Sequence, residues 1–319
     1  MWRCPTPIKT KEANLHDLFN VFMKAKQLEG LSERTLKDHQ SPFKYFDSYR
    51  EENFPSLILG KDISKEVIRD YIFYMSITKG LSPVTVNIRL RSLKCFFKFL
   101  YDENHIPINP TERIKLMKTP EDTIPAFSKE QITQILLQPD QQSYAGFRDY
   151  VLMMTFLDTG IRCKEVLGLE TMHFNEMNKT ITIPAYLAKN RKERTLPLSS
   201  KTTKLFKTLT QETRALEERE DFIFLSNYGS QLDGSGIRER IRIYGKKAGI
   251  TNVRVSPHTF RHTFTKFYIL NGGDPFTLQR ILGHSTMNMV RKYVQMNGED
   301  IQFQHTQFSP IHHLLKDIE

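Results

Sequence analysis

The stretch Val255–Val294 reads VSPHTFRHTFTKFYILNGGDPFTLQRILGHSTMNMVRKYV and places cations, imidazoles and a phenol within amphipathic helices. A helix that begins at its proline would carry His258 and Arg261 three residues apart, so both side chains would project from one face. His284 follows a glycine at an expected helix end, and Tyr293 follows two cations. A phenol surrounded by such groups is typical of a nucleophile directed at a phosphate.

The composition limits the class of protein to which this stretch belongs. A length of 319 residues favours about two domains, and 39% hydrophobic residues with 26% charged residues are close to globular averages. The net charge of +10 favours a polyanionic partner, either a nucleic acid or an acidic membrane surface. Three scattered cysteines, no apolar signal core and no long apolar run predict a soluble cytoplasmic protein without a membrane partner.

The first part of the chain is expected to form a helical domain over residues 13–113, after a flexible segment of residues 1–12. Apolar residues at helical spacing, preceded by capping residues, predict helices over residues 14–30, 32–53, 64–80 and 82–104. Pro42 is expected to interrupt or kink the second of these helices. Residues 114–126 are rich in charge and proline and are therefore expected to form an interdomain linker.

A second domain is expected over residues 127–303, followed by a C-terminal tail at residues 304–319. A capping box at Ser128, a nearly apolar helix that stops at Gly160, and further helices over residues 200–219 and 234–248 are predicted. Alternating β-branched residues predict two strands of a hairpin with a basic tip, and a short buried strand is expected in DFIFLS; these segments are residues 179–184, 195–198 and 221–226. The fold class is mainly α with a small antiparallel β-sheet.

Three further groups of residues are candidates for function, each with a simpler alternative. Arg162 and Glu165 are three residues apart, so the carboxylate could orient the guanidinium, although such a pair is often a surface ion pair. Cations at the hairpin tip could contact DNA or form a solvated turn: Lys189, Arg191, Lys192 and Arg194. Cations in the fourth helix could bind phosphates or form a solvated outer face: Arg89, Arg91, Lys94 and Lys98.

The order and spacing of these groups resemble the tyrosine recombinases, the phage-integrase family. The phrases TGIRCKEVLGL, SPHTFRHTF and ILGHSTMNMVRKYV look like the characteristic boxes of that family, and LSPVTVNIRLRSLKCFFKFL looks like its helical core-DNA-binding domain. The resemblance spans nearly the whole chain. It implies an N-terminal SAM-like DNA-binding domain and a mixed α/β catalytic domain.

The resemblance also assigns roles in phosphate chemistry. It implies that Tyr293 attacks a DNA phosphate and forms a 3′-phosphotyrosyl intermediate with a free 5′-hydroxyl. Arg162 and Arg261 would bind the non-bridging oxygens, because a planar guanidinium matches the geometry of a phosphate. His284 would donate a hydrogen bond to the same phosphate.

Proton transfer is assigned to other residues. The resemblance implies that Lys189, in preference to Lys192, protonates the leaving 5′-oxygen, that His258 acts as a base toward the nucleophile, and that Glu165 supports the site. The linkage to tyrosine conserves the energy of the phosphodiester, so neither a cofactor nor a metal is expected.

The expected function is site-specific DNA recombination, as integration or excision of a mobile element. The expected partners are duplex DNA with inverted core sites, on the nucleoid, and three further copies in a DNA-bound homo-tetramer. The terminal helical segment would dock either on its own domain or on a neighbouring protomer. Alternatives are Xer-type chromosome-dimer resolution, a type IB topoisomerase, and a non-catalytic DNA-binding regulator that retains the fold.

Overall fold

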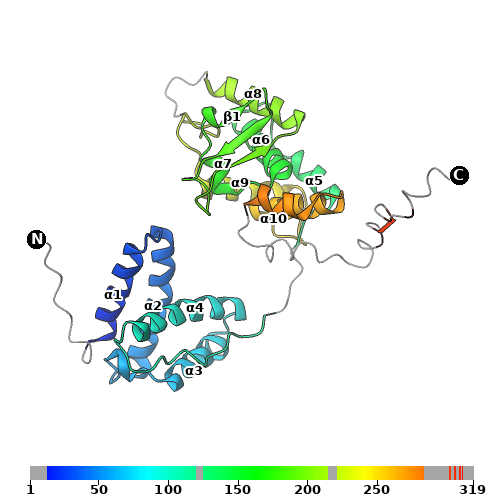
Figure 1. Ribbon diagram of the computed structural model, residues 1–319. Coiled ribbons are helices and arrows are strands. Elements are labelled where there is room, and N and C mark those ends of the chain that lie inside the picture. Colours follow the sequence, from blue (N-terminus) through cyan, green and yellow to red (C-terminus); the bar gives the residue numbers. More distant parts are fainter. Residues whose placement is uncertain are drawn as a thin grey trace, which may run out of the picture. The chain divides into compact units, whose positions relative to one another are not determined.

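The computed structural model describes residues 13–119, 125–214 and 221–283, together with a few isolated positions between 302 and 311. The chain divides into two compact units, Met1–Glu121 and Asp122–Glu319 (Figure 1). Within the described ranges, no helix combines the length and apolar character that crossing a membrane requires.

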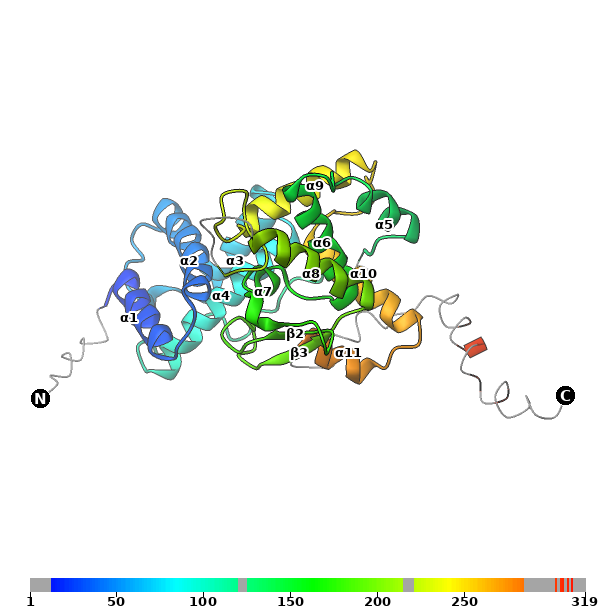
Figure 2. The same ribbon diagram turned by 90° about the horizontal axis from the view of Figure 1, so that it is seen from above.

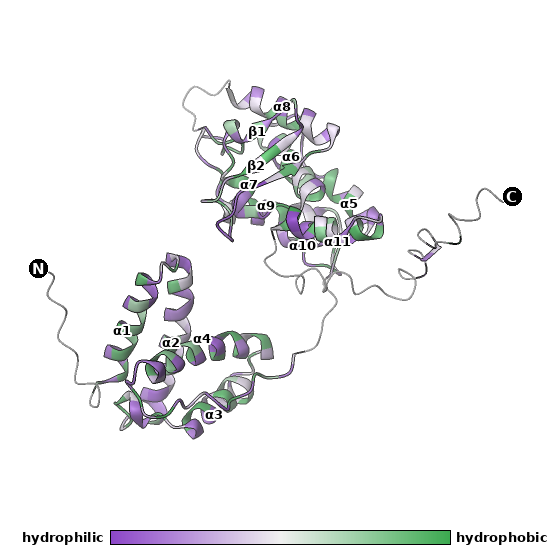
Figure 3. Cartoon of the chain, viewed as in Figure 1, coloured by the Kyte–Doolittle hydropathy of each residue, from purple (hydrophilic) through white to green (hydrophobic). Residues whose placement is uncertain are grey.

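The N-terminal unit is built from helices, as the apolar spacing predicted. Asn14, Ser32, Ser64 and Ser82 cap the N-termini of four α-helices with their side chains. The elements are α1 (Leu15–Leu28), α2 (Glu33–Asn53), η1 (Gly60–Asp62), α3 (Lys65–Phe73), η2 (Tyr74–Thr78) and α4 (Pro83–Asp102). Hydrophilic and hydrophobic residues alternate along these helices (Figure 3), as expected for helices with one buried face. Their buried faces meet in an aromatic core in which Phe19 stacks on Phe43.

Two of the N-terminal helices differ from the sequence prediction. Helix α2 continues through Pro42 as one element, so the expected interruption is wrong. Pro42 is buried in the helix next to Phe43, and this packing favours the continuous helix despite the lost N–H donor. The third predicted helix changes to a π-helical turn, η2, where the hydroxyl of Ser76 donates to the Ile72 carbonyl at 2.8 Å.

The segment after α4 is bound to the N-terminal unit farther than the expected domain end at residue 113. The side chain of Asn87 exchanges two hydrogen bonds with the backbone of Met117, at 2.8 and 2.9 Å. The ammonium of Lys94 donates to the carbonyls of Thr111 and Ile114 at 2.6 and 2.8 Å. Desolvation lowers the pKa of Lys94. Lys94 therefore holds the segment after α4 against the helical domain, a structural role that the sequence pattern did not predict.

The C-terminal unit combines helices with a three-stranded antiparallel sheet of order β1-β2-β3, in which Ile181 pairs with Leu196. Strand β1 was not predicted from the sequence. The fold class, mainly α with a small antiparallel sheet, is confirmed. The elements are α5 (Lys129–Leu136), α6 (Tyr144–Thr159), α7 (Cys163–Leu167), η3 (Thr171–His173), β1 (Phe174–Asn175), β2 (Thr180–Ile183), β3 (Arg194–Pro197), α8 (Ser200–Arg214), α9 (Gly234–Lys247), α10 (Pro257–Leu270) and α11 (Pro275–Leu282).

The predicted strand at residues 221–226 is wrong. Ile223 and Phe224 are fully buried, but the segment makes only isolated bridges, through Phe222 and Leu225, to two different parts of the chain. A short apolar run indicates burial and does not by itself distinguish a strand from a buried loop.

Helix α6 lies at the centre of the C-terminal unit. Val151, Leu152, Met153 and Phe156 are fully buried, and the helix packs against α8 and α10. Helix α11 lies against β3 (Figure 2). This packing brings the start of α7, the middle of α10 and the end of α11 to one place.

Candidate active site

Arg162 and Glu165 form the ion pair that their spacing predicted. Helix α6 ends at Gly160, whose φ of 61° is left-handed, and Arg162 then caps α7. The Arg162 Nη1 donates to Glu165 Oε1 at 3.0 Å, and the Arg162 backbone N–H donates to Oε2 at 3.1 Å. Glu165 is only 1% exposed, so this is a buried orienting contact and the alternative of a surface ion pair is excluded.

Arg194 is a second arginine on the same carboxylate. It was expected at the hairpin tip, either as a DNA contact or in a solvated turn, but it is the first residue of β3 and its side chain is only 10% exposed. Its two Nη atoms donate to Glu165 Oε1 at 3.2 Å and Oε2 at 2.5 Å. The placement of Arg194 at the tip is therefore wrong, because the strand begins one residue earlier than TLPL indicated.

Helix α10 supplies the third arginine of the cluster. Ser256 caps a helix that begins at Pro257, as predicted. Arg261 is 5% exposed and donates to the carbonyl of Gly160 at the end of α6. His258, one turn earlier, is exposed to solvent. Of this predicted pair, Arg261 is therefore buried and His258 is accessible to solvent.

The three arginines share a second set of acceptors at the C-terminus of α11. Arg194 Nε, Arg261 Nη2 and Arg162 Nη2 donate at 3.1, 2.7 and 3.4 Å to three successive carbonyls, those of Ile281, Leu282 and Gly283. A helix C-terminus has unpaired carbonyls and a partial negative charge, which cations stabilise. The arginines therefore hold Gly283, the residue that directly precedes His284 in the chain.

The electrostatics of the cluster favour an anion. Burial raises the pKa of Glu165, but the hydrogen bonds and charge of Arg194 and the charge of Arg162 outweigh it, so the net pKa lies below its usual value. The carboxylate therefore stays ionised and balances one of the three guanidinium charges. A guanidinium has five N–H donors, and the bonds of Arg162 to Glu165 and Gly283 use two of them.

The two histidines of α10 are held neutral. His258 is more exposed than Arg261, but partial desolvation of its ring and the charges of Arg261 and Arg162 still lower its pKa. Desolvation lowers the pKa of His262 to about 4, together with the repulsion that a protonated His262 would meet from a protonated His258 and from Arg261. A neutral imidazole is able to accept a proton at neutral pH.

Other predicted site residues lie outside this cluster. Lys189, Arg191 and Lys192 are exposed on the connection between β2 and β3. His284 and Tyr293 lie outside the described residues.

In α4, the cations chosen as DNA contacts have different environments. Arg89 lies 3.8 Å from the ring centroid of Tyr45, Lys98 pairs with Asp102 at 2.9 Å, and Arg91 is exposed. DNA contacts by these residues stay predictions.

A basic hollow beside α10 was missed in the sequence. Arg238, Arg242 and Lys246 are spaced four residues apart along α9, and Arg254 faces the same hollow of about 560 Å³, which reaches Ser256. The charges of Arg254 and Arg238 also lower the pKa of His258, so the hollow adjoins the candidate site. The regular spacing of the cations on α9 was a signal that could have identified it.

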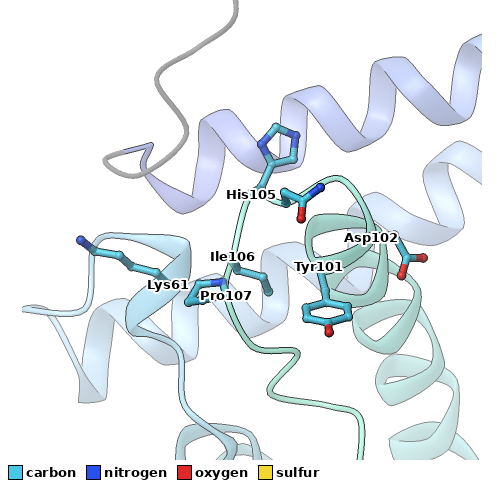
Figure 4. Close-up of a pocket in the computed structure, with 7 residues that line it drawn as sticks. Lys61, Tyr101, Asp102, His105, Ile106 and Pro107 are labelled. Atoms are coloured by element: carbon cyan, nitrogen blue, oxygen red, sulfur yellow. The ribbon is translucent and has the colours of Figure 1, made fainter.

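A second hollow, of about 660 Å³, lies in the N-terminal unit between the end of α4 and η1 (Figure 4). It is lined by Lys61, Tyr101, Asp102, Asn104, His105, Ile106 and Pro107. It contains none of the predicted catalytic residues.

One group of metal-type donors occurs among the described residues, formed by His16, Asp47 and Glu51. Arg50 donates to both carboxylates, and His16 contacts Asp47 at 2.6 Å, so three of the acidic oxygens already have partners. This arrangement does not fit a metal site.

Comparison with known proteins decides the family. The phage integrase family model matches residues 125–299, and the phage integrase SAM-like domain matches residues 14–116. The chain belongs to the phage integrase family. As a tyrosine recombinase, it is an enzyme of site-specific recombination that cleaves and rejoins DNA strands.

Individual relatives of this integrase-family chain include Xer recombinases. It is 26% identical over 300 residues to tyrosine recombinase XerD of Staphylococcus epidermidis, covering 93% of this chain and 99% of the relative. It is 25% identical over 281 residues to tyrosine recombinase XerC of Myxococcus xanthus, covering 86% and 91%.

Solved structures share the fold of this integrase-family chain. The Tn1549 transposon integrase in complex with a circular intermediate DNA has a TM-score of 0.75 and 17% identity, with 93% of this chain and 100% of that one covered. The XerH recombinase bound to its difH substrate has a TM-score of 0.68 and 20% identity, with 89% and 82% covered.

Proposed function

We propose that this recombinase cleaves DNA through Tyr293 and binds the scissile phosphate at Arg162 and Arg261. The observation that carries the proposal is the arginine cluster: one buried carboxylate binds two of the guanidinium groups, and the carbonyls at the end of α11 bind all three. The excess positive charge is positioned before substrate binds, which is the condition for electrostatic stabilisation of a transition state.

The proposed step exchanges one phosphodiester bond for another. The phenol oxygen of Tyr293 attacks phosphorus while its proton passes to His258, whose lowered pKa keeps it neutral and able to accept. The bond from phosphorus to the 5′-oxygen breaks, and Lys189 supplies the proton to this leaving oxygen. Arg162 and Arg261 neutralise the non-bridging oxygens. Attack of a 5′-hydroxyl on the phosphotyrosine reverses the sequence and restores the tyrosine.

The proposed partner is duplex DNA with inverted core sites, bound by a homo-tetramer on the nucleoid in the cytoplasm. The hollow between α9 and the segment that precedes α10 would hold the DNA backbone, because Arg238, Lys246 and Arg254 line it beside the Arg242–Glu239 ion pair, and it adjoins His258. The terminal segment would dock in trans. Deleting residues 309–319 is expected to reduce assembly of the synaptic complex, and unchanged assembly would refute docking in trans.

The proposed biological role is integration or excision of a mobile element. The sequence STMNMVRKYVQM supports it, since it resembles transposon and phage integrases. Xer-type chromosome-dimer resolution is the second candidate, and the relatives named XerD and XerC favour it. Sequencing the DNA next to the gene distinguishes them, because a mobile element is expected to carry inverted core repeats at its ends.

The substitution Tyr293→Phe tests the chemistry. With a nicked suicide duplex, the wild type is expected to form a covalent protein–DNA adduct, whereas Tyr293→Phe should bind the duplex with unchanged affinity and form none. Tyr268→Phe, on α10, is the matched control and should keep the adduct. A wild type that binds DNA without any adduct would indicate a non-catalytic regulator.

A further inference from the structure

Arg194 is bound more tightly than a residue at a DNA-contacting turn requires. Its guanidinium makes two hydrogen bonds to Glu165 and one to the Ile281 carbonyl. A planar guanidinium offers donors along two edges, so one side chain can hold a carboxylate and a carbonyl together. Arg194 thus links three parts of the unit: β3, the start of α7 and the end of α11.

The position of Arg194 in the chain connects this link to the proposed proton donor. Residues 184–193 form the connection between β2 and β3, and Lys189 is exposed in it. Arg194 is the point at which this connection re-enters the sheet. The bond from Arg194 to Glu165 therefore fixes the end of the connection relative to the carboxylate that also orients Arg162.

We propose that Arg194 is a positioning residue for the recombination reaction, which holds the Lys189 connection in register with the phosphate-binding arginines and with the end of α11. The inference rests on the proposed function, because it takes Lys189 as the proton donor. Arg162 has its own bonds to Glu165 Oε1 and to the Gly283 carbonyl, which do not pass through Arg194. Loss of Arg194 should therefore impair proton transfer more than phosphate binding.

A leaving group that needs no proton separates these two effects. A thiol has a pKa of roughly 8.5, far below that of an alcohol. When sulfur replaces the 5′-bridging oxygen of the substrate, the leaving group therefore departs as a thiolate without a general acid. The measurement is the single-turnover rate of covalent adduct formation on matched suicide duplexes with 5′-oxygen or 5′-sulfur.

The test variant is Arg194→Lys, which keeps the charge but cannot bond Glu165 and Ile281 together. Since misplacing a catalytic group by about 1 Å can cost on the order of 10²-fold, cleavage of the oxygen duplex is expected to slow by roughly 10- to 100-fold. Cleavage of the sulfur duplex should slow by less than about 3-fold, as it should for Lys189→Ala. If Arg194→Lys does not fold, Arg194→Gln is tested in the same way.

The matched control is Arg148→Lys. Arg148 lies in the same unit with a side chain 3% exposed, against 10% for Arg194, and it donates to a carboxylate, Asp149, and to a carbonyl, that of Leu225. It should lower stability without changing the ratio of the oxygen and sulfur rates. If Arg194→Lys slowed cleavage of both duplexes equally, or slowed cleavage of neither, the positioning role would be overturned. If Lys189→Ala itself cleaved the oxygen duplex at the wild-type rate, the assignment of Lys189 in the proposed function would be refuted, and the positioning role with it.

Discussion

Gly160 joins the end of α6 to the arginine cluster and provides a quantitative test of the packing. Its φ of +61° lies in the left-handed region, and an added Cβ would lie 2.9 Å from Leu282 Cδ2 and still closer to Phe264 Cδ1. Gly160→Ala therefore combines a backbone penalty with a steric overlap. Gly249 is the matched control, because its φ is +70° but an added Cβ would meet nothing within 4 Å.

The two contributions can be estimated separately. A left-handed conformation costs a residue with a Cβ roughly 1–2 kcal/mol, and inserting a methyl group into a packed site costs about 1–3 kcal/mol. Gly249→Ala should lower the free energy of unfolding by about 1 kcal/mol and Gly160→Ala by about 3 kcal/mol. For a unit of this size these values correspond to decreases in Tm of roughly 2–4 °C and 6–12 °C.

Differential scanning calorimetry of the full chain provides the measurement, in which each of the two compact units is expected to give its own transition. Both substitutions lie in the C-terminal unit, so only its transition should move. If Gly160→Ala and Gly249→Ala lowered Tm equally, the close packing of Gly160 against Phe264 and Leu282 would be refuted.

Three further predictions concern the other contacts. Asn87→Ala should lower the free energy of unfolding of the N-terminal unit by about 2–4 kcal/mol in urea denaturation, since it leaves two backbone groups unpaired, and a loss below about 0.5 kcal/mol would contradict the pairing. His262 has a folded pKa of about 4 against its usual 6.5, so the unfolded chain binds more protons between these values and stability falls as pH is lowered through that window. His262→Gln should remove roughly 1–2 kcal/mol of this fall, after allowance for solvent screening, and an unchanged pH profile of Tm would argue against a neutral His262. The double variant Arg238→Ala, Lys246→Ala should reduce the slope of log affinity for duplex DNA against log salt by about 1.8, and an unchanged slope would exclude backbone contacts in the basic hollow. The control is a double alanine variant of two exposed cations on α8, Lys201 and Lys204.

Local sequence determined most of the secondary structure. Capping residues and apolar spacing act within one or two turns, so the helices beginning after Ser32, Ser82, Ser128 and Ser256 could be predicted. The ion pair of Arg162 with Glu165 was also predictable, since residues three apart share one helical face. The order of the boxes along the chain was sufficient to indicate the family.

Tertiary structure decided the environment of individual cations. Lys94 and Arg194 look like surface charges in the sequence, but each is bound to backbone carbonyls, at least 17 residues away for Lys94 and 87 residues away for Arg194. Arg238 and Arg254 border one hollow although they belong to different segments. Local spacing determines which face of a helix a residue occupies, whereas the partner on that face depends on how distant segments pack. The sequence therefore predicted Arg162, Glu165 and Arg261 as site residues, and the tertiary structure decided that the end of α11 is the place where three arginines converge.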